Sequence, residues 1–342
     1  MNVKSKFDLR SISISRKVLV FVSLLFTVAL VFSCFIFAFN DISPFARPAD
    51  NVVSNEWELR NAIINAIKPT VIALDNDITL TNSTLTIPAG KDITITSNGK
   101  NEVYKLIGVA GESTITIDEG GVLSLAGIVV THKINKTGRG VTVNSGGILT
   151  MSGGEISGNT VDNIQAGGGV RIYDMGTFSL SGGKISDNTA FVGGGVYFDG
   201  TFTMSGGEIS GNTAYSGGGV WVNHGSFNVY SGKISDNTAQ YQGGGVYIGI
   251  GENVFKLFGG EVFGNTASNG GGIWVNIESL DKIFVSNSAV FSNNQATTAY
   301  NRDSQHDGVY NSNIDTKVVW TSPFTQGYNN YDIGYTSMHK LL

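Results

Sequence analysis

Residues 193–222, GGGVYFDGTFTMSGGEISGNTAYSGGGVWV, contain one full repeat of a unit that recurs along the middle of the chain. Identical or related copies of its decapeptide MSGGEISGNT stand at 151–160, 181–190, 204–213, 230–239 and 258–267. Its second block, GGG followed by an apolar residue, recurs from Val170 to Ile273 at intervals of 26, 24, 26 and 27 residues. A period of this length is typical of solenoids, in which each repeat buries its apolar face only by stacking on its neighbours.

Alternation of apolar and polar residues within the repeat indicates three short β-strands. In the quoted copy, the inward side chains would be Val196 and Phe198, then Phe202 and Met204, then Ile209; in the last copy, Val290 would take the place of Ile209. Glycine-rich turns separate the three strands. The sequence therefore predicts an all-β fold in which each repeat forms one coil of a parallel β-helix, a solenoid.

The composition agrees with this fold class and excludes others. The 342 residues include 46 glycines and 5 prolines, and 41% of them are hydrophobic. The glycines follow no strict three-residue period, which excludes collagen, and the hydrophobic fraction excludes a flexible linker. Residues 40–342 carry 17 basic and 26 acidic side chains. An acidic domain of this kind is a poor nucleic-acid partner, so we expect no nucleic acid to bind.

The alternation of GGG[VI][YW][VIF] with [IV][SF]xNTA resembles the repeats of adhesin-like surface proteins with pectate-lyase-like β-helices. It is similar in kind to the GGAI and FxxN repeats of polymorphic outer-membrane proteins, although GGGV replaces GGAI here. The resemblance covers residues 138–296 most clearly and implies a right-handed parallel β-helix. It implies little about activity, because this superfamily holds lyases, hydrolases and non-enzymatic adhesins.

The N-terminal part of the chain has the pattern of an exported protein. Residues 1–17 form a basic segment, and residues 18–39 run without a charge. The uncharged run is long enough to cross a bilayer, and the basic flank predicts that residues 40–342 lie outside. Two interpretations remain open: an uncleaved transmembrane anchor in the cytoplasmic membrane, which we favour, or a signal segment that is cleaved to give a secreted protein. The chain would then be a cell-surface protein.

The remaining boundaries follow from turn and helix signals. Residues 40–53 are expected to be a linker, and 54–296 the β-helix, with regular repeats over 138–296. A capping α-helix is predicted over 55–67, where Asn55 is a suitable N-cap and apolar residues recur at helical spacing. Such a helix would cover the unpaired strand edges at the N-terminal end. Residues 297–342 are expected to form an irregular last coil or cap.

Stacking turns each repeat position into a column of side chains. An asparagine column follows the third strand and is interpreted as a structural ladder: Asn159, Asn188, Asn212, Asn237, Asn265 and Asn293. A column of alternating charge precedes the third-strand apolar residue and is also interpreted as structural: Glu155, Lys184, Glu208, Lys233 and Glu261. Amides stack well along such ladders, and opposite charges across strands stabilise them.

The candidate binding residues form a third column, between the two buried positions of the first strand. This column is predicted to face solvent: Arg171, Tyr197, Trp221, Tyr247 and Trp274. A second aromatic set follows the NTA turn at Phe191, Tyr215 and Tyr241. An exposed aromatic stripe would suit an adhesin that binds an extracellular glycan or a surface protein. The alternative is that the rings only pack against one another on the sheet exterior.

Catalysis is the less favoured hypothesis. Glycoside hydrolysis needs two convergent carboxylates, and no such pair is visible in the sequence. Asn223-His224-Gly225 and Arg171-Ile172-Tyr173 only partly match polygalacturonase segments, in reversed order. The four histidines lack the spacing of a zinc site, so we expect no metal and no cofactor. The alternatives are a polysaccharide lyase or glycoside hydrolase with its site on the irregular turns near 160–166 or 224–226, or a passive envelope spacer.

Overall fold

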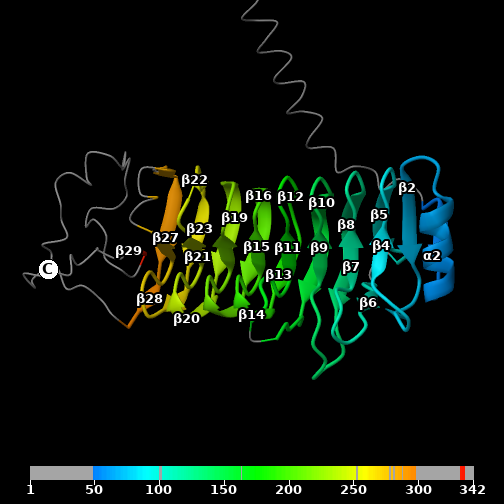
Figure 1. The fold of residues 1–342 in the computed structure, drawn as a ribbon, viewed down its shortest axis with the longest axis horizontal. Helices are drawn as coiled ribbons and strands as arrows, with labels where there is room; N and C mark the ends of the chain where they lie inside the picture. The colour runs from blue at the N-terminus through cyan, green and yellow to red at the C-terminus, as the bar shows by residue number, and fades with distance from the viewer. Residues whose placement is uncertain are drawn as a thin grey trace, which may run out of the picture. The chain divides into compact units, whose positions relative to one another are not determined.

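The computed structural model describes residues 49–297, apart from positions 100, 101, 163, 252, 277, 278, 280, 281 and 287, and residues 332–335. The described residues form a parallel β-solenoid of about eight turns. Figure 1 shows the coils side by side, from the helix α2 at the blue end to β27 and β28 at the orange end. Three sheets run along the stack, and every strand pairing in them that we describe is parallel.

Sheet A has 15 strands. They are β1 (Asn51–Val53), β2 (Thr70–Leu74), β3 (Ile78–Thr79), β5 (Asp92–Ser97), β6 (Lys105–Ile107), β8 (Val122–Thr131), β10 (Ile148–Ser157), β12 (Thr177–Leu180), β13 (Lys184–Ser186), β16 (Thr201–Ser210), β19 (Ser226–Ser235), β22 (Val254–Leu257), β23 (Gly260–Phe263), β26 (Ile283–Val285) and β27 (Ala289–Ser292).

Sheets B and C have nine and five strands. Sheet B contains β4 (Leu85–Ile87), β7 (Ile115–Ile117), β9 (Val141–Val143), β11 (Val170–Ile172), β15 (Val196–Phe198), β18 (Val220–Val222), β21 (Val246–Ile248), β25 (Ile273–Val275) and β29 (Ile333–Tyr335). Sheet C contains β14 (Thr189–Val192), β17 (Thr213–Ser216), β20 (Thr238–Gln242), β24 (Thr266–Ala267) and β28 (Gln295–Ala296).

One hydrophobic core runs through all the coils. The predicted inward residues of the quoted repeat are fully buried, and each pairs with its equivalent in the next coil, as Val196 does with Val220 and Phe202 with Phe227. The rings of Phe178, Phe202 and Phe227 stack in the core, with centroids 4.7 and 4.6 Å apart. The register is fixed because a slip of one residue would turn these side chains to the surface.

The three sheets differ from the three predicted strands. The second and third predicted strands of a coil belong to one sheet, and in β10, β16 and β19 they are continuous. Glycines with positive φ, such as Gly207 (φ +74°), form a bulge in β16 rather than a turn. Sheet C is built instead from strands that begin at the Thr and Ala of the NTA segments, and each buries its alanine, such as Ala190 or Ala214.

The last coil corrects two predicted positions. In β27, Phe291 pairs with Val262, so it takes the place that the sequence assigned to Val290. Val290 is 53% exposed, whereas Ala289 before it is buried. The cause is a shift of one residue: the preceding turn directs Ala289 inward, and alternation then exposes Val290. The asparagine that follows is displaced by the same amount.

The chain ends of the described part also differ from expectation. Asn51–Val53, which the sequence assigned to the linker, form β1 and pair with β2. Ile333–Tyr335, within the predicted irregular end, pair with β25 as the last strand of sheet B. The segments 1–48, 298–331 and 336–342 lie outside the described residues, and so do the predicted basic segment and anchor.

Helix α2 (Glu56–Asn65) is the one α-helix of the described residues, and it lies at the end of the stack beside β2 (Figure 1). The Asn55 side chain accepts from the Glu58 amide, as an N-cap does. Leu59 and Ile63 are buried in the common core. The helix ends earlier than predicted, because Ala66 is extended (ψ 120°), and Ile67, predicted to face the core, is 96% exposed.

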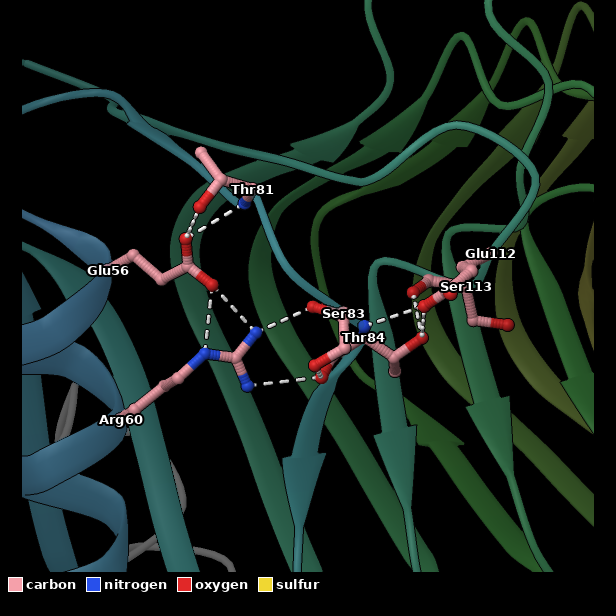
Figure 2. Close-up of polar contacts among 7 residues, drawn as sticks. All are labelled: Glu56, Arg60, Thr81, Ser83, Thr84, Glu112 and Ser113. Atoms are coloured by element: carbon pink, nitrogen blue, oxygen red, sulfur yellow. Dashed lines mark hydrogen bonds and ion pairs between the residues drawn. The ribbon is translucent and has the colours of Figure 1, made fainter.

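A polar network fastens α2 to the first coils (Figure 2). Arg60 pairs with Glu56 one turn earlier and donates to the carbonyl oxygens of Ser83 and Thr84. Glu56 in turn accepts from the amide and the hydroxyl of Thr81, at 2.8 and 2.7 Å. The loop that carries Thr81 is thus held between the helix and the next coil.

Within the described chain, no helix has both the length and the apolar character needed to cross a membrane.

Candidate functional site

The asparagine column is a buried hydrogen-bonded ladder. Each side-chain amide donates to the Oδ1 of the asparagine in the next coil, as Asn188 does to Asn212 at 3.0 Å and Asn212 to Asn237 at 2.9 Å. Each Oδ1 also accepts from the backbone N–H of the preceding asparagine, and each Nδ2 donates to a carbonyl of the coil before it. Both donors and both acceptor sites of each amide are therefore used. The ladder runs through Asn159, Asn188, Asn212, Asn237, Asn265 and Asn294.

The two ends of this ladder were missed by sequence reasoning. Asn294, not Asn293, accepts from Asn265, because β27 is shifted by one residue; Asn293 instead has positive φ (56°). Asn294 then donates to Asp332, 2.9 Å away. At the other end, Nδ1 of His132 lies 2.8 Å from Oδ1 of Asn159. The repeat period gave a signal for His132, which stands 27 residues before Asn159.

The charge column lies on the outside of sheet A in the expected register. Glu155 pairs with Lys184, Lys184 with Glu208, Glu208 with Lys233, and Lys233 with Glu261. The ion pairs are long and partly exposed. Nζ of Lys184 lies 3.4 Å from Oε1 of Glu208, and Nζ of Lys233 lies 4.0 Å from Oε2 of Glu261. Exposed pairs of this kind stabilise little and offer no cleft for a substrate.

The aromatic column consists of Arg171, Tyr197, Trp221, Tyr247 and Trp274, the central residues of successive sheet B strands. The Arg171 guanidinium lies over the rings of Tyr173 and Tyr197, with its Cζ 4.5 and 4.6 Å from the two ring centroids. Tyr197 and Trp221 are 6.4 Å apart, and the next two centroid distances are 3.7 and 4.6 Å. Flat rings thus follow one another along four coils.

This column is less exposed than predicted. Arg171, Tyr197, Trp221 and Tyr247 are half-buried, and Trp274 is only 3% exposed, which corrects the expectation that it faces solvent. Each ring covers a face of the next, and at Trp274 the neighbouring strand β29 adds a further coil, with Gly334 opposite Trp274. Burial raises the pKa of Tyr247 to about 12, and the neighbouring Tyr241 adds to the shift. The indole N–H groups of Trp221 and Trp274 have no acceptor within the described part of the chain.

A more exposed set of rings lies beside the column on sheet C. We call Phe191, Tyr215 and Tyr241 the outer aromatic row; they come from β14, β17 and β20 and are 40–44% exposed. Their centroids are 5.2 and 5.8 Å apart. In each coil, a row residue precedes a column residue in the sequence. Between the two stand only the three glycines of a GGG block and the residues that flank them. We call the row and the column together the aromatic surface; in each coil they lie on consecutive strands, of sheet C and of sheet B.

A small polar cluster borders the aromatic column at the turn after β15. Asp199 accepts from Asn223 at 2.6 Å, and Nδ1 of His224 is 3.6 Å from the same oxygen. Arg171 lies 4.0 Å from the other carboxylate oxygen. The cluster holds one carboxylate, whereas glycoside hydrolysis uses two. The sequence singled out His224 and Arg171 in separate segments, and it gave no signal that Asp199 lies between them.

Comparisons with known proteins leave the identity of the chain open. No protein-family model matches it, and no curated protein or solved structure is detectably similar to it.

Among the described residues, no three His, Cys, Asp or Glu side chains are grouped so as to hold a metal ion.

Proposed function

We propose that this chain is an exported, non-enzymatic surface protein of the adhesin type, with a right-handed, pectate-lyase-like β-helix that binds extracellular glycans or proteins. Residues 18–39 would anchor it in the cytoplasmic membrane, with residues 40–342 outside. A right-handed coil is the hand that crossovers between parallel strands nearly always take. Helix α2 would serve as the cap of the N-terminal end.

The observation that carries the proposal is the aromatic surface. Its outer row keeps Tyr215 and Tyr241 at 40 and 44% exposure on paired strands of sheet C, and the half-buried column lies on the strands of sheet B that follow in each coil. Exposed aromatic rings on a rigid support supply large contact area at small entropic cost, and such patches mark binding sites. Their repetition along the coils suits an extended or repetitive ligand.

A second candidate function rests on the polar cluster at Asp199. The cluster brings the Asp199 carboxylate close to the Arg171 guanidinium and to the imidazole of His224, which belongs to the turn near 224–226. A polysaccharide lyase or glycoside hydrolase is therefore the alternative. The third hypothesis is a passive envelope spacer, in which the aromatic surface would bind no ligand.

The test is a binding and turnover panel with the purified full chain in detergent or nanodiscs. Polysaccharides and extracellular matrix proteins would be immobilised, and each soluble polysaccharide would also be incubated with the chain and assayed for new reducing or unsaturated ends. We expect saturable binding to at least one panel member and no cleavage. Cleavage that disappears in Asp199→Asn would contradict the proposal in favour of an enzyme, and the absence of all binding would favour the spacer.

A further inference from the structure

The N-terminal end of the solenoid carries an apolar patch that no function above uses. We call it the end patch; its exposed members are Val52, Trp57, Ile64 and Ile67, which are 49, 73, 62 and 96% exposed. They lie on β1, on α2 and just after α2. An open groove of about 800 Å³ lies between helix and strand, with Trp57, Ile67 and Val52 on its walls. Large side chains gathered in this way mark an interaction surface.

The outward face of α2 combines large apolar side chains with polar ones, among them Glu58 beside the groove. Leu59 and Ile63 face the core, so Trp57 and Ile64 project from the opposite side. The polar residues exposed near them are mostly uncharged, including Asn51 and Asn65. Lys68 is exposed next to Ile67 and forms an ion pair with Asp50 at 3.2 Å. Helices that lie in the plane of a bilayer surface combine Trp and aliphatic residues with lysine at the boundary.

The position of the patch in the chain identifies its partner. The uncharged run ends at Phe39, and residues 40–48 separate it from Ala49, the first described residue. Ten peptide units reach at most about 35 Å. If residues 18–39 span a bilayer, the end patch therefore belongs to the part of the solenoid that is tethered closest to the lipid surface.

We propose that the end patch rests on the lipid bilayer, with Trp57, Ile64 and Ile67 in the interfacial layer, so that the solenoid is held at its N-terminal end. This inference rests on the proposed anchoring through residues 18–39. It explains why α2 keeps apolar side chains on both faces: one face contacts the protein core and the other contacts lipid. A solenoid supported in this way presents its sheets, and the aromatic surface on them, to the exterior.

The test places a spin label on the patch of the full chain in phosphatidylcholine vesicles. Cys34, the single cysteine of the chain, is changed to Ser, and Ile67→Cys supplies the labelling site. Ile134→Cys is the matched control, because Ile134 is also an isoleucine and is 90% exposed, but it lies in a loop of a middle coil. Accessibility of each label to oxygen, which partitions into lipid, and to a water-soluble nickel chelate is measured by power saturation.

We expect the oxygen-to-nickel accessibility ratio to be severalfold higher at position 67 than at position 134. A nickel accessibility at 67 equal to that at 134 would overturn the inference while the anchor stands. Low accessibility to both reagents would also overturn it, because a protein segment or a second copy would then cover the patch. If the chain does not float with the vesicles at all, both the anchor and the inference are contradicted.

Discussion

At the scale of single residues, the asparagine ladder explains why a glycine-rich chain holds a fixed register. Asn159 and its equivalents are completely buried, and each satisfies its amide within the ladder. A buried polar group without a partner is costly, so a slip of one residue would leave many such groups unpaired. The ladder therefore fixes the register mainly by making misregistered states unfavourable. The net stabilisation from its hydrogen bonds matters less.

Removing one ladder member should be strongly destabilising. Asn212→Ala removes the acceptor of the backbone N–H and of one side-chain N–H of Asn188, and it removes the side-chain donor to the Oδ1 of Asn237. Each unsatisfied group costs about 1–3 kcal/mol, so we expect a loss of about 3 kcal/mol or more in the free energy of unfolding. The measurement is urea unfolding followed by circular dichroism. Asn65→Ala, at an exposed helix position, should change the free energy by less than about 0.5 kcal/mol, and equal effects of the two changes would refute the role of the ladder.

The third glycine of each GGG block is required for space. A Cβ on Gly219 would lie 2.6 Å from the carbonyl oxygen of Gly245 and 3.0 Å from Nδ2 of Asn237. Gly219→Ala should therefore lower the free energy of unfolding by about 1–3 kcal/mol through overpacking. Gly153 is the matched control in β10, because the nearest heavy atoms to its added Cβ are 3.8 Å away. The measurement is the Tm of each variant from thermal unfolding. A Tm of Gly153→Ala as low as that of Gly219→Ala would contradict the explanation by overpacking.

At the scale of elements, the fastening of α2 depends on one carboxylate. Burial by itself would raise the pKa of Glu56, but the hydrogen bonds from Thr81 and the contact with Arg60 outweigh it and lower the pKa below 4.5. A carboxylate whose pKa is depressed in the folded state stabilises the fold above its unfolded pKa, and this contribution is lost as the pH falls through the folded pKa.

Glu56→Gln should therefore lower the Tm most at neutral pH. The difference in Tm from the unchanged protein should shrink as the pH falls below about 4.5, since protonation removes the same charge from Glu56. Hydrogen exchange of residues 56–65 at neutral pH should also rise in the variant. Glu119→Gln, at an exposed turn, serves as control. A Tm difference that stays constant from pH 7 to pH 3 would show that the charge of Glu56 does not hold the helix.

Much of the solenoid could be predicted because the repeat period links each residue to its neighbours across the coils. The inward pair Val196 and Phe198 and the column from Asn159 to Asn265 follow from that period alone. Sheet C could not be predicted in this way, because its strands bury an alanine and, in β17 and β20, the polar Ser216 and Gln242, and so show no apolar alternation. The shift from Asn293 to Asn294 depends on how one turn directs Ala289, which the spacing does not reveal.

The candidate binding surface could be predicted only in part. Alternation places Tyr197 and Trp221 on the outside of sheet B, and the pairing agrees. It does not show how far stacked rings cover one another, so the 3% exposure of Trp274 was not foreseen. The greater exposure of Tyr215 and Tyr241 likewise depends on sheet C.

At the scale of the whole molecule, the described residues form a rigid stack with different surfaces on its different sides. Sheet A presents the charge column, sheets B and C present the aromatic surface, and the N-terminal end presents the end patch. Because each coil contacts mainly its neighbours, a change on one surface should leave the others folded. This separation allows the binding proposal to be tested by substitutions at exposed rings alone.

The measurement that tests the central claim most directly is the affinity of three proteins for the ligand that the panel identifies: the unchanged full chain, Tyr215→Ser/Tyr241→Ser, and Tyr230→Ser. Tyr230 is the matched control, because it is a 54% exposed tyrosine that stacks on Phe258, on sheet A rather than sheets B and C. Loss of central aromatic contacts costs about 2 kcal/mol or more, so Kd should rise at least about tenfold in the double variant and stay unchanged in Tyr230→Ser. An unchanged Kd in a folded double variant would contradict binding through the aromatic surface.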